Sequence, residues 1–165
     1  MRIAARIRTI FLPLLIAPLG FVGFTAWFAA QDGITAVARE LLTFKLQEVV
    51  RFASAQYGLL EQNGLQDDHT FLAAAVTGIS EHADSLTRSP SEEIFAIDGA
   101  GRLVFSQGSI DAVDAAQLAL DPPARGWSRF TLGGEARVGV MEPFAPLDWV
   151  IIASEAESAF FAPVD

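Results

Sequence analysis

Near its N-terminus the chain carries 23 consecutive uncharged residues, Thr9 to Gln31, with the sequence TIFLPLLIAPLGFVGFTAWFAAQ. As a helix rising about 1.5 Å per residue, this stretch would measure roughly 30–35 Å, the thickness of the hydrocarbon core of a bilayer. Three arginines and no acidic residue precede it, and Asp32 follows it directly. The positive-inside rule therefore predicts a cytoplasmic tail over 1–8, a transmembrane helix over 9–31 and an extracytoplasmic domain over 32–165.

A cleaved signal peptide is the main alternative to this anchor. Its apolar region usually covers about 7–15 residues and ends at a site with small side chains. The stretch here is longer, and bulky Trp27 and Phe28 stand at the −3 position of the candidate cleavage sites. These two aromatic residues suit the outer interface of a retained span. We expect a protein of the inner membrane whose domain faces the periplasm, although the sequence leaves open the outer face of a Gram-positive cell.

The charge of the predicted extracytoplasmic domain restricts its partners. All 20 acidic residues and only 8 of the 11 basic residues follow Gln31, so residues 32–165 carry a formal net charge of −12. Nucleic-acid binding and docking on anionic lipid both need a basic surface, and neither is expected. The absence of cysteine excludes disulfides and thiolate chemistry. The domain must therefore be held together by its apolar core.

Two helices are predicted at the start of this domain. Over residues 32–62, apolar side chains recur with the spacing of one helical face, and further apolar residues widen that face to a second side. Two apolar sides indicate two neighbours, namely the rest of the domain and a second copy in a homodimer. Asn63 and Gly64 are expected to end this helix. A second helix is predicted after Asp67 or Asp68, either of which could cap it.

The apolar period then changes from that of helices to that of strands. The sequence predicts a sheet core over residues 92–155 that also contains a short helix over 111–120. The predicted strands are 94–97, 103–105, 127–132, 136–144 and 149–154. The first two form a hairpin around the turn Asp98-Gly99-Ala100-Gly101, and the last three form a meander. The fold class is therefore α+β, a five-stranded antiparallel sheet with flanking helices, and the tail after Glu155 begins another helix.

The order of these elements resembles the single Cache domains, which are PAS-like sensor domains of bacterial transmembrane receptors. The resemblance lies in IFAIDGAGRLVFS (94–106), GWSRFTLGGEARVGVMEPF (126–144) and LDWVIIASEAESAFFAPV (147–164). In that family, a last strand that begins with tryptophan leads through an acidic and aromatic stretch into a second membrane helix. The resemblance implies a histidine kinase, chemoreceptor or cyclase that is truncated before its second span. A protein with one span is the alternative.

The sequence offers little support for an enzyme. His69 and His82 are 13 residues apart, which is not a metal-ligand spacing, and no metal or cofactor is expected. The paired carboxylates Glu92 and Glu93 stand at the edge of a predicted strand, where capping and solvation would explain them. No nucleophile or phosphate-loop motif is present. We therefore expect no catalysis in this segment.

Four residues of the last strands are candidates for binding a small ligand. Alternation places Trp127 and Arg129 on one face of their strand, and Arg137 and Met141 on one face of the next strand. An arginine in a half-buried site can hold a carboxylate through two parallel hydrogen bonds, and a tryptophan can cover an apolar or cationic group. Alternatively, both arginines lie on the solvent face and pair with Glu135 or Glu142. The hypothesis is a ligand that carries a carboxylate, either an organic acid or an amino acid.

These expectations give two alternative functions. In the first, the domain is a sensor that closes on its ligand and displaces helix 32–62 relative to the C-terminal segment, which relays a signal across the membrane. In the second, the domain is a membrane-anchored interaction or scaffold module without a small ligand. A sensor should contain a pocket with convergent polar groups, whereas an interaction module should expose an apolar patch.

Overall fold

The computed structural model describes residue 21 and residues 36–106, 110, 118 and 125–161. The chain divides into two compact units, Met1–Val37 and Ala38–Asp165. The contacts described below, from residue 38 onward, belong to the second unit. Within the part of the chain that the structure describes, no helix has the length and apolar composition needed to cross a membrane. The predicted span over 9–31 lies outside the described residues apart from Phe21.

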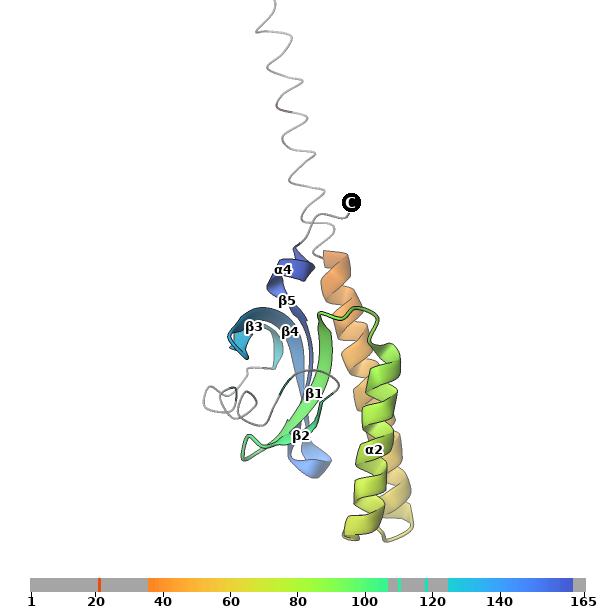
Figure 1. The fold of residues 1–165 in the computed structure, drawn as a ribbon. Helices are drawn as coiled ribbons and strands as arrows, with labels where there is room; N and C mark the ends of the chain where they lie inside the picture. Colours follow the sequence, from red (N-terminus) through yellow and green to blue (C-terminus); the bar gives the residue numbers. More distant parts are fainter. Residues whose placement is uncertain (1–20, 22–35, 107–109, 111–117, 119–124, 162–165) are drawn as a thin grey trace, which may run out of the picture. The chain divides into compact units, whose positions relative to one another are not determined.

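Two helices form one layer of the second unit (Figure 1). The first is described over 36–62, and the face predicted from its apolar spacing is the buried one. It ends as predicted, with Gly64 in the left-handed region at φ 67°. The second helix, α2, covers His69–Leu86. Of the two predicted caps, Asp68 is the one used, because its Oδ1 accepts hydrogen bonds from the backbone N–H groups of Thr70 and Phe71.

The second layer is a five-stranded antiparallel sheet, which confirms the predicted α+β class. Its strands are β1 (Glu92–Asp98), β2 (Leu103–Ser106), β3 (Gly126–Leu132), β4 (Glu135–Phe144) and β5 (Trp149–Ala156). A 3-10 turn, η1 (Ala145–Leu147), precedes β5, and the short helix α4 (Glu157–Phe160) follows it. The strand order is β2-β1-β5-β4-β3. The predicted hairpin and the predicted three-strand meander are both present, and the pairing of β1 with β5 joins them into one sheet.

Apolar residues pack on both faces of this sheet, and the two faces are named by what covers them. The helix-side face packs against helix 36–62 and α2, and its central residues are Ile94, Ala96, Val138, Val140, Ile151 and Ala153. The far face carries a second apolar cluster, and its central residues are Phe95, Ile97, Met141 and Ile152. Ile110 and Leu118 belong to the far cluster. The rest of the predicted helix over 111–120 lies outside the described residues.

The β1–β2 hairpin turns as predicted, around the carboxylate of Asp98. Its Oδ1 accepts from the backbone N–H groups of Ala100 and Arg102 at 3.0 and 2.8 Å. Its Oδ2 accepts from Arg102 Nε at 2.8 Å, while the arginine side chain is otherwise exposed. Desolvation acts to raise the pKa of Asp98, but the hydrogen bonds from Arg102 and Ala100 and the charge of Arg102 outweigh it, so this pKa is lowered.

Because the pKa of Asp98 is lower in the folded protein than in the unfolded chain, its ionised form stabilises the turn at neutral pH. This contribution is fully present above the unfolded-state pKa and is lost as the pH falls through the folded-state value. Asp98→Asn is therefore expected to lower the free energy of unfolding at pH 7 and to cause progressively less loss toward pH 2. Urea unfolding of both proteins at several pH values measures this difference. A difference that does not change with pH would contradict the assignment.

Candidate functional site

The four candidate ligand residues lie on two opposite faces of the sheet. In the β3–β4 pairing, Arg129 is opposite Val138, so Trp127 and Arg129 belong to the helix-side face. Arg137 is opposite Phe130 in the same ladder, and Met141 belongs to the far cluster. Residues that face each other across a strand pair share a face of the sheet. The structure therefore brings Arg137 and Met141 to one face and leaves Trp127 and Arg129 on the other.

Trp127 lies between the two segments at the ends of the described domain. The guanidinium carbon of Arg39, on helix 36–62, is 4.5 Å from the centre of the indole ring. On α4, the ring centre of Phe160 is 5.3 Å from that of Trp127. The indole ring therefore contacts both helix 36–62 and α4. In the described residues, the ring packs against groups of the protein itself.

Arg129 is a surface residue. Its side chain is 64% exposed, its Nε lies 3.6 Å from a carboxylate oxygen of Glu157, and its guanidinium carbon is 5.4 Å from the ring centre of Phe161. Arg129 is thus exposed, as in the alternative, but its acidic partner is Glu157 and not Glu135 or Glu142. An exposed ion pair of this kind contributes little to stability.

Arg137 is buried on the far face, where only 4% of it is exposed. Its Nη2 donates to the backbone carbonyl of Ser91 at 2.6 Å, and its Nε donates to Ser154 Oγ at 3.2 Å. The buried carboxylate of Glu93 approaches Nη2 to 3.8 Å. The structure thus fixes two of the three guanidinium nitrogens on groups of the protein interior.

The third nitrogen of Arg137 has a different kind of partner. Its Nη1 donates at 3.0 Å to Glu135, whose side chain is 54% exposed at the start of β4. A half-exposed carboxylate can rotate into water at small cost, because such ion pairs are weak. A carboxylate from outside could therefore replace Glu135 on Nη1, while the bonds to Ser91 and Ser154 keep the other two nitrogens attached to the protein.

The surroundings of Arg137 on the far face combine this charge with an apolar floor. Across the sheet, Gly139 is opposite Ser154, and Met141 is opposite Ile152. A Cβ at position 139 would lie 2.7 Å from the carbonyl oxygen of Ala153 and 2.9 Å from Ser154 Cβ, so a side chain does not fit there. Glycine at this position lets β4 approach Ser154 of β5 closely.

Three further buried charged residues were missed by the sequence analysis. Strand β1 begins at Glu92, not at the expected residue 94, and both Glu92 and Glu93 are 6% exposed. The expectation that solvation explains these carboxylates is therefore wrong. Both are paired with cations, because Glu92 binds Lys45 and Glu93 lies beside Arg137. No local pattern reveals the first pair, since Lys45 is 47 residues from its partner.

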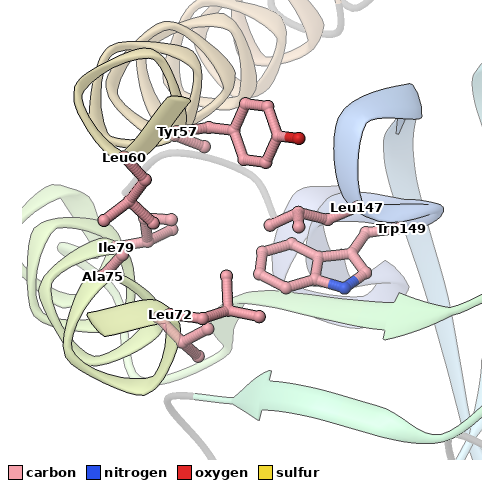
Figure 2. A pocket seen from close by; sticks show the side chains of 9 residues that line it. Tyr57, Leu60, Leu72, Ala75, Ile79, Leu147 and Trp149 are labelled. Carbon is pink, nitrogen blue, oxygen red and sulfur yellow. The ribbon is translucent and has the colours of Figure 1, made fainter. Parts of the chain in front are cut away.

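A separate apolar pocket lies between helix 36–62, α2 and the start of β5 (Figure 2). Its lining includes Tyr57, Leu72, Leu147 and Trp149. The volume of about 190 Å³ includes the open mouth, and no space large enough for a water molecule is enclosed. The pocket contains none of the four candidate residues and no charged group. In the described structure it is a shallow apolar depression and not a site for a carboxylate.

The predicted second apolar side of helix 36–62 consists of Leu41, Phe44, Val50 and Phe52. Leu41 and Phe44 stand out from this helix, whereas Val50 and Phe52 pack partly against the core. His82 stacks on Phe52 with 4.3 Å between ring centres. Among the residues that the structure describes, no three His, Cys, Asp or Glu side chains are grouped so that they could hold a metal ion.

Comparisons with known proteins give matches at the level of structure. No protein-family model matches the chain, and no curated protein matches it. One similar solved structure is the ligand-binding domain of the Pseudomonas aeruginosa PAO1 amino acid chemoreceptor PctB in complex with L-Arg, with a TM-score of 0.39, 19% identity and 55% of this chain covered. Another is the ligand-binding domain of Mlp24 with asparagine, with a TM-score of 0.38, 16% identity and 52% of this chain covered.

The likeness to these two structures is partial. The matches span 42% of the PctB chain and 36% of the Mlp24 chain. With TM-scores below 0.5, they do not identify a ligand or a binding residue in this chain. Both neighbours are ligand-binding domains, and PctB is a chemoreceptor.

Proposed function

We propose that residues 32–165 form the extracytoplasmic ligand-sensing domain of a membrane-bound receptor. The ligand is a small molecule with a carboxylate, either an organic acid or an amino acid, and its binding displaces helix 36–62 relative to the C-terminal segment. The observation that carries this proposal is the buried Arg137, whose Nη1 donates to the half-exposed Glu135. Such a group offers a preformed donor to a carboxylate in surroundings of low dielectric.

The positions of the elements support a relay in this proposal. Helix 36–62 packs on the helix-side face, while Arg137 lies on the opposite face of the same sheet. Strand β5 contributes Ser154 to Arg137 and continues directly into α4. The start of helix 36–62 and α4 meet at Trp127. A movement of β5 on ligand binding would therefore change the contact between the two segments that, in the proposed topology, lead to the membrane.

A thermal-shift screen of the full chain in detergent micelles tests the ligand part of the proposal. The panel contains amino acids, L-Arg and L-Asn among them, and small mono- and dicarboxylates. A ligand at 100 times its dissociation constant adds about 2.7 kcal/mol of stability. For a domain of this size, that increase raises Tm by about 5–15 °C. A panel without any shift would leave the proposed ligand class without support.

Matched variants assign the ligand shift to one arginine. Arg129→Ala, on the neighbouring strand and exposed, is expected to retain the shift. The double variant Arg137→Gln/Glu93→Gln removes both partners of a buried ion pair and is expected to fold but to lose the shift. Arg137→Lys should show a ligand shift smaller than that of the wild type but larger than that of the double variant, since lysine keeps the charge but lacks the planar fork. A full shift in the double variant would exclude Arg137 from the site.

The membrane anchor is a separate part of the proposal and has its own test. Gly20→Arg places a charge in the middle of the proposed span, which costs roughly 2.5–3.5 kcal/mol on the insertion scale. The fraction of the chain that sediments with membranes is expected to fall, while Gly58→Arg, a helical position outside the span with open space around it, should leave this fraction unchanged. A mature protein that begins near Gln31 and stays soluble would show that the segment is a signal peptide.

An interaction module remains the second candidate because Leu41 and Phe44 are exposed on helix 36–62. In the receptor proposal, the same two residues contact a second copy of the chain in a homodimer. Leu41→Lys/Phe44→Lys should then convert the dimer to a monomer in analytical ultracentrifugation in detergent while the ligand shift of the thermal screen remains. If the wild-type chain is instead a monomer and no ligand of the panel raises its Tm, the interaction module is favoured.

A further inference from the structure

The two carboxylates at the start of β1 are consecutive in sequence but lie on opposite faces of the sheet. Both Glu92 and Glu93 are 94% buried. Adjacent side chains of a strand point to opposite faces, and the contacts follow this rule. Glu92 binds a residue of helix 36–62, whereas Glu93 lies beside Arg137 of the far face. One dipeptide therefore contacts both helix 36–62 and the proposed ligand-binding arginine.

On the helix-side face, Glu92 is held by three hydrogen bonds. Nζ of Lys45 donates to its two carboxylate oxygens at 2.5 and 2.7 Å, and the backbone N–H of Arg88 donates at 3.0 Å. Lys45 is 4% exposed. Among the described residues, this buried ion pair joins helix 36–62 to the sheet. It fixes one position of the helix against one position of β1.

On the far face, Arg137 holds the backbone on both sides of Glu92. Its Nη2 donates to the carbonyl oxygen of Ser91 at 2.6 Å. Its Nε donates to Ser154 Oγ, and that hydroxyl in turn donates to the carbonyl oxygen of Glu93 at 3.4 Å. The guanidinium is thus bonded, directly and through one hydroxyl, to the residues before and after Glu92. A movement of the guanidinium would move the peptide that carries this carboxylate.

We infer that Glu92 and Lys45 are positioning residues that couple Arg137 to helix 36–62 through the backbone of Ser91–Glu93. This inference rests on the proposed function, because the signal that it transmits is the occupation of Arg137. A buried ion pair is often no more stabilising than apolar residues of similar volume, so net stability does not account for Lys45 and Glu92. A coupling role does, because an ion pair breaks and re-forms between discrete arrangements.

Hydrogen exchange of the full chain in detergent micelles, without any ligand, tests this coupling. The readout is the protection of the amides over 42–49 on helix 36–62. Arg137→Lys loses the fork that reaches Ser91 and is expected to reduce this protection by about tenfold, within the range for coupled residues. The double variant Lys45→Met/Glu92→Gln removes the ion pair but keeps an oxygen acceptor for the Arg88 N–H. In this background, Arg137→Lys should reduce the protection of the same amides less than threefold.

A control on the same face distinguishes coupling from general destabilisation. Met141→Ala opens a cavity on β4 without touching either ion pair, and it should reduce the protection by the same factor in both backgrounds. If Arg137→Lys does not fold, Ser154→Ala removes the link to the Glu93 carbonyl and is compared in the same way. Equal factors for the Arg137 or Ser154 substitution in the two backgrounds would overturn the inference.

Failure of this inference and failure of the proposed function give different results. The exchange experiment contains no ligand, so equal factors would reject the coupling through Glu92 and leave the thermal-shift screen unaffected. Conversely, unequal factors together with a screen that finds no ligand would establish the coupling of the two faces while removing the carboxylate ligand as its cause.

Discussion

Lys45→Met is expected to lower the free energy of unfolding by about 3–5 kcal/mol, because it leaves the buried carboxylate of Glu92 without its cation. Urea unfolding of the full chain in detergent, followed by near-UV circular dichroism, measures this change. The double variant Lys45→Met/Glu92→Gln removes both charges and should recover most of the loss. An exposed ion pair on the same helix supplies the matched control: Arg51→Met, beside Glu48, should change stability by less than about 1 kcal/mol.

A loss for Lys45→Met as small as that for Arg51→Met would contradict the buried ion pair. So would a double variant as unstable as the single one, because neutralising Glu92 should relieve the penalty of an unpaired buried charge.

Arg137→Met is expected to lower the free energy of unfolding by about 3–5 kcal/mol as well, because Glu93 loses its cation and the carbonyl of Ser91 loses its donor. Arg129→Met is the matched control from the adjacent strand and should cost less than about 1 kcal/mol, because its side chain is 64% exposed. The same unfolding measurement compares the two variants. Similar losses for both would show that the two arginines do not differ in burial as described.

The sequence predicts the local elements of this domain because their signals are local. The apolar spacing of Leu42, Leu46, Val49 and Ala53 predicts the buried face of helix 36–62. The Asp98–Gly101 stretch predicts the first hairpin turn. By contrast, the pairing of β1 with β5 joins segments more than 50 residues apart, with no turn between them to indicate it. Only the packed sheet reveals that pairing.

The candidate site is predicted in part, and the missing step concerns strand register. Alternation within each strand is correct, but it does not say which face of β3 matches which face of β4. The two-residue turn Gly133–Gly134 supplies that information, since it forces Leu132 opposite Glu135 and therefore Phe130 opposite Arg137. Combined with the alternation, this register would have separated Arg129 from Arg137. The sequence thus holds a signal for the two faces that alternation alone does not use.

The buried charges could not be predicted for a physical reason. A pair of glutamates at the edge of a strand is usually solvated, and burial becomes acceptable only when cations from elsewhere approach them. Here those cations are Lys45, from a helix 47 residues earlier, and Arg137, from a strand more than 40 residues later. Their approach depends on the complete tertiary fold, so no local pattern indicates it.

The central claim is that Arg137 binds the carboxylate of a small ligand, and calorimetric titration of the full chain tests it most directly. The titrant is the strongest ligand from the thermal screen, compared with the same molecule in which the carboxylate has become a carboxamide. The account predicts binding of the acid that falls by at least about tenfold for the carboxamide, with no binding of either by Arg137→Gln/Glu93→Gln. Equal affinity for the acid and the carboxamide, or unchanged binding in the double variant, would contradict it.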